Sequence, residues 1–156
     1  MGEKLLIPDS LRIYAPFSNY IADSIELANS KYKIYSHINA SCPTCVSDIL
    51  LWDNIISDFE KFKVPVILIC ESDDNFDLFE YIIETGEIKS FSFPFFLDLK
   101  SDFYVQNKFM KESSQFETVL TDSNNIILLL DISVMLTPVS VILTPLHRKW
   151  FKEQKV

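Results

Sequence analysis

The chain has 156 residues, of which 48% are hydrophobic and 13% aromatic, and its formal net charge is −8 at pH 7. This composition is typical of a folded domain with a substantial core and excludes a disordered or fibrous chain, so we expect a single domain over residues 1–156. Because the acidic residues are spread along the chain and do not form a tail, the charge argues against nucleic acid as a partner.

The first 30 residues predict an extended segment and a polar connector ahead of a domain core at residues 31–156. The extended segment covers residues 5–14. Met1 to Lys4 lack the long apolar region of a secretory signal. The chain is therefore either cytoplasmic or a mature fragment whose export segment has been removed.

A dithiol at the junction of a strand pattern and a helix pattern is the most informative motif. Residues 32–39 alternate as a strand does and lead into Cys42-Pro43-Thr44-Cys45. Pro43 suits the first turn of a helix, where a missing N–H costs nothing. Apolar residues then recur at steps of three and four, at Cys45, Ile49, Trp52, Ile56 and Phe59. We expect an amphipathic helix to about Lys63, with Cys42 at or just before its N-terminus and Cys45 on its buried face.

The remaining elements predict an α/β fold. In chain order they are a buried parallel strand at 64–70, a helix at 75–85 ended by Gly86, an extended aromatic run at 91–99, a short helix at 101–110, a hairpin of strands 116–121 and 125–131, and a final helix opened by Thr144-Pro145. Strands that alternate with helices and end in a hairpin predict a central mixed sheet with helices on both faces. Since Gly2 and Gly86 are the only glycines, Asn and Asp must take most positive-φ turn positions, as in the turns at 73–75 and 122–125.

Residues 126–146 are numerous enough to cross a bilayer. They include Asp131, Pro138 and Pro145 and many β-branched side chains, which are typical of buried or edge strands. We therefore expect no transmembrane segment.

Disulfide exchange requires an accessible thiolate that attacks and a second thiol that resolves the mixed disulfide. Cys42, at the helix N-terminus, is the expected nucleophile with the lower pKa, and Cys45 is the expected resolving thiol. The alternatives are a structural cysteine pair and a zinc site. Zinc would need two more ligands, and His37, Cys70 and His147 form no recognised pattern, so we expect neither a metal nor a cofactor.

Other chemistry-bearing residues have ordinary structural interpretations. Cys70 ends an apolar strand and is expected to be a small buried hydrophobe. His37 is either a proton-transfer group or a hydrogen-bonded or solvent-facing strand histidine. Trp52, Trp150 and the aromatic residues of 91–96 are expected in the core, or alternatively on a hydrophobic substrate surface beside the thiols.

A Cys-x-x-Cys beside a βαβ pattern resembles the thioredoxin fold. The details resemble the TlpA/ResA-type thioredoxin-like proteins of bacterial cell envelopes. The similar segments are Ser41-Cys42-Pro43-Thr44-Cys45, the strand at 64–69, residues 93–98 with Phe103 and Asn107 behind them, and the run at 118–122. This resemblance implies a thioredoxin-like fold, protein substrates with cysteines or disulfides, and a redox partner protein. Residues 2–8 resemble the start of mature envelope lipoproteins, which implies a periplasmic or cell-envelope location and a lipid anchor in the precursor.

The chain departs from this family at three positions. Ser41 replaces a tryptophan before the first cysteine, and Ser36 lies where classical thioredoxins bury an acidic proton acceptor. Phe116 falls at the family's cis-proline, and because a cis bond before Phe costs about 3 kcal/mol, we expect it to be trans. The resemblance implies that the substrate contacts Pro43, Thr44, Phe116 and Glu117. A trans bond before Phe116 implies that the loop facing the thiols is rebuilt.

The leading hypothesis is a thiol–disulfide oxidoreductase that acts on protein cysteines through Cys42 and Cys45. An alternative is a thioredoxin-fold binding or scaffold module whose dithiol is not used catalytically. A third is a peroxidase acting through Cys42, which would need polar groups that activate peroxide, and none stands out in the sequence.

Overall fold

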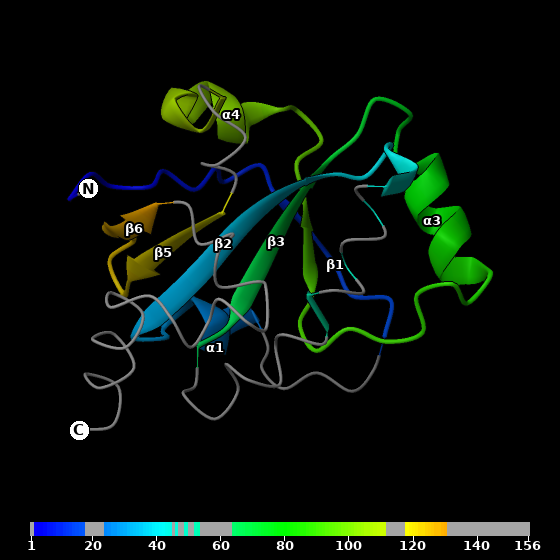
Figure 1. Ribbon diagram of the computed structural model, residues 1–156, viewed down its shortest axis with the longest axis horizontal. Coiled ribbons are helices and arrows are strands. Elements are labelled where there is room, and N and C mark those ends of the chain that lie inside the picture. Colours follow the sequence, from blue (N-terminus) through cyan, green and yellow to red (C-terminus); the bar gives the residue numbers. More distant parts are fainter. Residues whose placement is uncertain are drawn as a thin grey trace.

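The computed structural model describes residues 2–17, 24–44, 46, 49, 52–53, 64–111 and 118–130. They form a sheet flanked by helices (Figure 1). The elements are β1 (Arg12–Tyr14), α1 (Ser24–Ala28), β2 (Tyr32–Asn39), β3 (Val66–Glu71), α3 (Asp77–Glu84), β4 (Phe95–Leu97), α4 (Asp102–Gln106), the 3-10 helix η1 (Lys108–Lys111), β5 (Thr118–Asp122) and β6 (Ile127–Leu130). Pro43, Thr44, Val46, Ile49, Trp52 and Asp53 are also helical.

The six strands form one mixed sheet in the order β1-β4-β3-β2-β5-β6. Strands β2, β3 and β4 are parallel, whereas β1, β5 and β6 pair antiparallel with their neighbours. The carboxyl ends of the three parallel strands therefore meet at one edge of the sheet. In open α/β sheets this edge is where ligands bind.

The strand register gives the sheet two differently covered faces. On one face Leu68 lies opposite Ser36 and Phe95, and the Phe79 ring of α3 meets Phe95 edge-on at 5.1 Å between centroids. We call this the α3 face. On the other, the α4 face, His37 lies opposite Ile69, and the Phe103 ring of α4 stacks 6.0 Å from His37. Helices thus cover both faces, as the sequence predicts.

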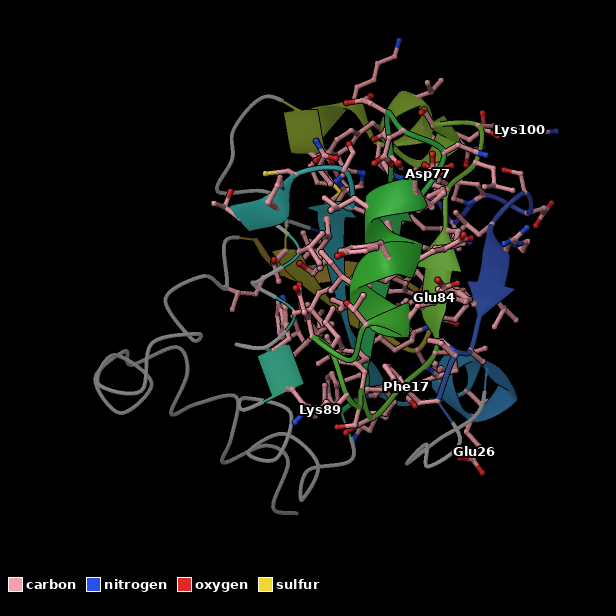
Figure 2. All side chains as sticks on the ribbon, turned by 90° about the vertical axis from the view of Figure 1, so that its right-hand side faces the viewer. Phe17, Glu26, Asp77, Glu84, Lys89 and Lys100 are labelled. Atoms are coloured by element: carbon pink, nitrogen blue, oxygen red, sulfur yellow. The ribbon has the colours of Figure 1, made fainter. Side chains whose placement is uncertain are left out.

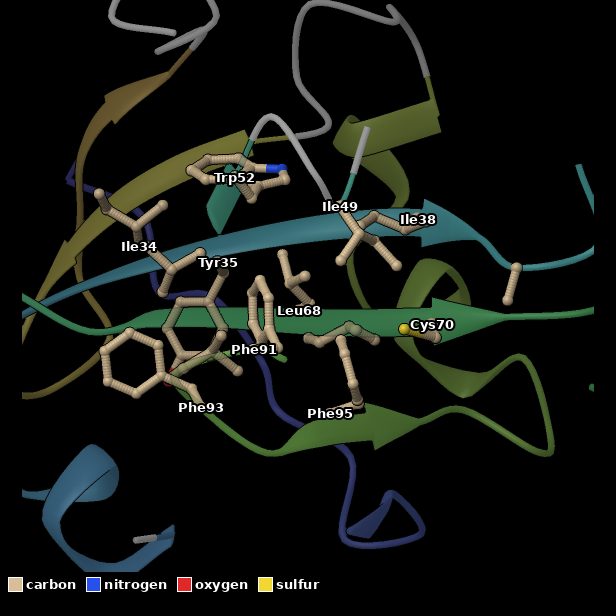
Figure 3. Close-up of a cluster of buried hydrophobic side chains, with 14 of the residues drawn as sticks. Ile34, Tyr35, Ile38, Ile49, Trp52, Leu68, Cys70, Phe91, Phe93 and Phe95 are labelled. Carbon is tan, nitrogen blue, oxygen red and sulfur yellow. The ribbon is translucent and has the colours of Figure 1, made fainter. Parts of the chain in front are cut away.

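Large aromatic and aliphatic side chains fill the α3 face. Phe79, Phe91 and Phe95 are fully buried, and the Phe91 and Phe95 rings stack with centroids 4.9 Å apart. Trp52 and Ile49 pack in the same cluster (Figure 3). The predicted core positions are confirmed for Trp52 and for Phe91, Phe93 and Phe95, while Phe96 is half-buried and Trp150 lies outside the described residues.

The N-terminal segment crosses the α4 face and pairs with the sheet at both sides. Its first residues lie beside β6, where Gly2 N donates to Ile127 O at 2.9 Å and Ile127 N donates to Glu3 O at 2.8 Å. The backbone of Leu6 then exchanges two hydrogen bonds with the Asn107 side chain, at 2.8 and 2.7 Å. The segment ends as β1 on the far side of β4. We call residues 2–14 the N-terminal strap.

Most predicted elements are present with adjusted limits. The strand at 32–39 is confirmed as β2, the strand at 64–70 as β3 and the helix at 75–85 as α3, with Gly86 at φ 78° after its end. The late hairpin is confirmed as β5 and β6. Asn75 and Asn125 take positive φ as predicted, but so do Phe76 and Ser101, which the sequence did not indicate.

Three predictions need correction. The connector before residue 31 contains the short helix α1, and the extended run at 91–99 is a strand only at Phe95–Leu97. The helix at 101–110 divides into α4 and η1, because the Asn107 amide donates back to Phe103 O at 2.8 Å and outward to Leu6 O. In the described part of the chain, no helix is long and apolar enough to cross a membrane. The predicted final helix and residues 131–156 lie outside that part.

Candidate thiol site

Cys42 lies at the carboxyl edge of the parallel strands, three residues after the end of β2. Its N–H donates to Asn39 O at 3.3 Å, and its carbonyl accepts the first helical hydrogen bond, from Val46 N at 3.0 Å. Cys42 is therefore the N-cap residue and Pro43 the first helical residue, where proline is best tolerated. This agrees with the position predicted from the sequence.

Cys42 is a half-buried residue, and its sulfur has a hydroxyl neighbour. Sγ lies 3.2 Å from Thr44 Oγ1, and either atom can donate. When the hydroxyl donates, it stabilises the charged thiolate more than the neutral thiol. Pro43 and Thr44 are both exposed, so the side of the turn next to the sulfur is open to a visiting molecule.

Ser41 connects the turn at residues 41–44, which we call the thiol turn, to the loop at residues 72–76 that follows β3. Ser41 Oγ lies 2.6 Å from Asn39 Oδ1, which also accepts the Ser41 N–H at 3.0 Å. On its other side Ser41 Oγ accepts the N–H of Asp73 at 3.1 Å. A polar link between two loops thus takes the place of the aromatic residue that the resemblance leads one to expect before Cys42.

The loop after β3 is acidic. It contains Asp73 and Asp74 shortly after Glu71, the last residue of β3, and no lysine or arginine occurs between residues 64 and 88. The pKa of Asp74 is lowered, chiefly by the hydrogen bond from the Ser72 hydroxyl and further by backbone N–H groups at the start of α3. Asp74 therefore remains ionised at neutral pH, and the surroundings of the thiol turn carry negative charge.

His37 and Cys70 lie on opposite faces of the sheet and do not approach a common ligand. On the α4 face, His37 Nε2 lies 3.1 Å from Glu71 Oε2, and its ring stacks 3.9 Å from that of Tyr104. His37 is thus a hydrogen-bonded strand histidine, one of the two alternatives considered. Cys70 is fully buried on the α3 face, and loss of solvation raises the pKa of its thiol to about 12. Among the described residues, no three His, Cys, Asp or Glu side chains form a group that could hold a metal.

Ser36, one of three buried polar residues of β2 together with Lys33 and His37, is paired with a hydroxyl group of β5. Ser36 Oγ lies 2.8 Å from Thr118 Oγ1, and both residues are buried. One hydroxyl donates to the other, so this buried hydrogen bond involves no charge. The residue at this strand position therefore cannot act as a buried carboxylate.

Several predicted site residues lie outside the described residues, namely Cys45, Phe116 and Glu117. Their roles, and the trans bond expected before Phe116, stay predictions. The Ser41–Asp73 contact was missed at the sequence level because it joins residues 32 positions apart. The hydrogen bond from Ser41 N to Asn39 Oδ1 was accessible from the sequence, since Asn side chains often bond a backbone N–H two residues further on.

Comparisons with known proteins identify the fold. No family model and no curated protein sequence matches the chain. Among solved structures, a candidate protein disulfide isomerase from Bacteroides thetaiotaomicron has a TM-score of 0.54 at 15% identity, covering 100% of this chain and 91% of that one. A hypothetical protein from Sinorhizobium meliloti 1021 has a TM-score of 0.51 at 13% identity, with coverages of 83% and 68%. An uncharacterized thioredoxin-like protein from Porphyromonas gingivalis has a TM-score of 0.45 at 16% identity, with coverages of 80% and 74%. At these identities the likeness is one of architecture, and the mixed six-stranded sheet with helices on both faces is a thioredoxin-like fold.

Proposed function

We propose that this protein is a thiol–disulfide oxidoreductase that exchanges disulfides with the cysteines of other proteins through Cys42 and Cys45. The observation that carries the proposal is the position of Cys42, a half-buried residue at a helix N-cap where the parallel strands end. The positive end of the helix dipole favours a thiolate there. The Thr44 hydroxyl at 3.2 Å supports the same charge state.

The exchange proceeds in two displacements. The Cys42 thiolate attacks one sulfur of a substrate disulfide, an S–S bond forms between Cys42 and the substrate, and the departing substrate thiolate takes a proton from water. Cys45, as a thiolate, then attacks the Cys42 sulfur and releases the second substrate thiol. Two electrons have passed to the substrate, and a Cys42–Cys45 disulfide remains for a redox partner protein to reduce. The same steps in reverse oxidise a dithiol.

Substrate docking uses the exposed side of the thiol turn. Pro43 and Thr44 are exposed beside the sulfur, and Phe116 and Glu117 are the further contacts that the resemblance implies. We place the protein in the TlpA/ResA-type group, as one domain over residues 1–156, in the periplasm or cell envelope with a lipid anchor in the precursor. The resemblance of residues 2–8 to mature envelope lipoproteins supports this location.

A second candidate is a thioredoxin-fold binding or scaffold module with a dithiol that is not used catalytically. The Ser36–Thr118 hydroxyl pair favours it, because no buried carboxylate stands at that position of β2 to accept a proton during exchange. Ser41 favours it too, since its polar link to Asp73 replaces an apolar wall beside the thiol.

One experiment separates the two candidates. The reduced protein is mixed with a protein disulfide and with glutathione disulfide, and mixed disulfides and products are followed by quenched mass spectrometry. An oxidoreductase exchanges rapidly, loses exchange in Cys42→Ser, and retains it in Cys70→Ala, which removes only the buried thiol. Exchange in Cys42→Ser at the wild-type rate would remove the assignment, and a wild-type protein that reacts with neither disulfide would favour the binding module.

A further inference from the structure

We propose that Ser41 is a positioning residue that holds Asp73 against the thiol turn, and that this contact makes Cys42 prefer disulfides bearing positive charge. The inference rests on the proposed function and names its substrate class. It is carried by the hydrogen bonds of Ser41, which join the residue before Cys42 to the loop after β3.

The roles of the atoms follow from counting hydrogens. Ser41 has one hydroxyl hydrogen, and the short 2.6 Å contact commits it to Asn39 Oδ1, which can only accept. A lone pair of Ser41 Oγ is then left for the N–H of Asp73 at 3.1 Å. Alanine at position 41 would remove both bonds, whereas threonine would retain the hydroxyl.

The loop that carries Asp73 is anchored at both ends by other contacts. At β3, Ala40 N donates to Glu71 O at 2.7 Å, and at α3 Asp74 Oδ2 accepts the N–H of Leu78 at 3.1 Å. Between these anchors, Asp73 N donates to Ser41 Oγ of the thiol turn at 3.1 Å. Ser41 therefore controls how close the backbone of Asp73 stays to Cys42 without deciding whether the loop folds.

The charge that Asp73 brings is not offset by basic residues nearby in sequence. No lysine or arginine occurs between residues 34 and 60 or between residues 64 and 88. Asp73 is exposed, so its carboxylate acts through solvent and is screened by salt. An approaching ammonium group is attracted and an approaching carboxylate is repelled, which changes the encounter rate more than the chemistry.

The test compares three small disulfides of different charge on a protein in which Cys45→Ser stops resolution. The probes are cystamine, which is cationic, bis(2-hydroxyethyl) disulfide, which is neutral, and dithiodiglycolate, which is anionic. In each reaction the Cys42 thiolate forms an S–S bond with half of the probe, the probe's own S–S bond breaks, and the other half leaves as a thiolate that is protonated by water. Intact mass spectrometry counts the adduct, and the buried Cys70 does not contribute. Because the rate for each charged probe is divided by that for the neutral probe, the thiolate fraction cancels.

At low ionic strength we expect one nearby charge to change each charged-probe rate by about twofold, so that the cystamine to dithiodiglycolate ratio falls by about fourfold when that charge is removed. Ser41→Ala and Asp73→Asn should each lower the ratio, and the double variant should lower it no further than Asp73→Asn alone. Ser41→Thr should keep the wild-type ratio. The matched controls are Ser90→Ala and Glu84→Gln, and they should leave the ratio unchanged. Glu84 is the last residue of α3, and Figure 2 shows Glu84 and Lys89, the residue before Ser90, below Asp77 at the start of the helix.

An unchanged ratio in Ser41→Ala, or an equal effect of Asp73→Asn with and without Ser41, would overturn the proposal. A second readout is independent of thiol chemistry: amide hydrogen exchange at Asp73 should accelerate at least severalfold in Ser41→Ala and not in Ser41→Thr. Unchanged exchange would also overturn it. Charge-dependent reaction with small probes but none with protein disulfides would reject the proposed function and leave the role of Ser41 standing. Exchange with protein disulfides but no charge preference among the small probes would keep the proposed function and reject the role of Ser41.

Discussion

His37 on β2 is tied to Glu71 at the end of β3 by a 3.1 Å contact between Nε2 and Oε2, beneath the ring of Tyr104. Both residues belong to parallel strands whose carboxyl ends lead into the thiol turn and the acidic loop. The pair therefore fixes these strand ends from the α4 face, while Ser41 links the loops beyond them.

The first prediction concerns this pair. We expect His37→Ala to lower the free energy of unfolding by about 2–3 kcal/mol, because it removes both a hydrogen bond to a carboxylate and aromatic stacking. His37→Phe retains the stacking and should cost about 1 kcal/mol less. Urea denaturation measures both values, with the exposed Tyr81→Ala as the control that should stay within about 0.5 kcal/mol of wild type. Equal losses for the two His37 variants would contradict the stacking contribution.

The second prediction concerns the hydroxyl beside the nucleophile. Thr44→Val removes the only group of that side chain able to donate to the Cys42 sulfur, so alkylation by iodoacetamide at pH 7 should slow about fivefold, as expected for one hydrogen bond of about 1 kcal/mol. Thr44→Ser should react at nearly the wild-type rate. The rates are best measured in the Cys45→Ser background, where Cys42 is the one accessible thiol of the motif. A Thr44→Val protein that reacts as fast as Thr44→Ser would show that the 3.2 Å contact does not stabilise the thiolate.

A third prediction concerns Asp98, a buried carboxylate at the carboxyl end of β4. Its two oxygens each accept a backbone N–H at the start of α4, from Asp102 and from Phe103, both at 3.0 Å. Asp98→Ala leaves both donors without an acceptor and should cost about 2 kcal/mol of stability. Asp98→Asn retains one carbonyl acceptor and should cost about half as much. Thermal denaturation of these variants, with the exposed Asp9→Ala as a control, would refute the capping role if all three melted together.

The fourth prediction follows from the raised pKa of Cys70. The unfolded thiol ionises near pH 9 and the folded one near pH 12, so above pH 9 the unfolded state releases a proton that the folded state keeps. The free energy of unfolding should therefore fall as the pH rises. At one pH unit above the ionisation of the unfolded thiol, Cys70 should account for about 1.4 kcal/mol of this loss. Cys70→Ala should remove this share from urea denaturation measured under reducing conditions between about pH 8 and pH 10.5. Identical pH slopes for the two proteins would show that the buried thiol is not protected from ionisation.

Local patterns were enough to predict the central elements and the position of Cys42. Alternation located β2 to the residue, and Cys42 followed directly by Pro43 located the helix N-cap, because both patterns depend on neighbouring residues along the chain. The break between α4 and η1 could not be predicted in this way. It depends on Asn107, whose amide bonds the strap at Leu6, 101 positions away.

The candidate site was predictable to the same extent. Chain order identified Cys42 at the start of a helix, and burial of Cys70 followed from its apolar strand, whereas the contact of Thr44 Oγ1 with the Cys42 sulfur was not predicted. The Ser41–Asp73 and His37–Glu71 contacts were not accessible from the sequence, since each joins one βα unit to the next and requires the strands to be in register first.

The N-terminal strap covers the edges of β6 and β4, so the sheet depends on this segment staying attached. Proteolytic nicking after Tyr14 would release the residues that bond Ile127 of β6 and pair with β4, and would uncover Leu5, which is fully buried. Each molecule would then expose two unpaired strand edges, which can pair with strands of further copies. An intact N-terminal strap therefore prevents self-association through these strand edges.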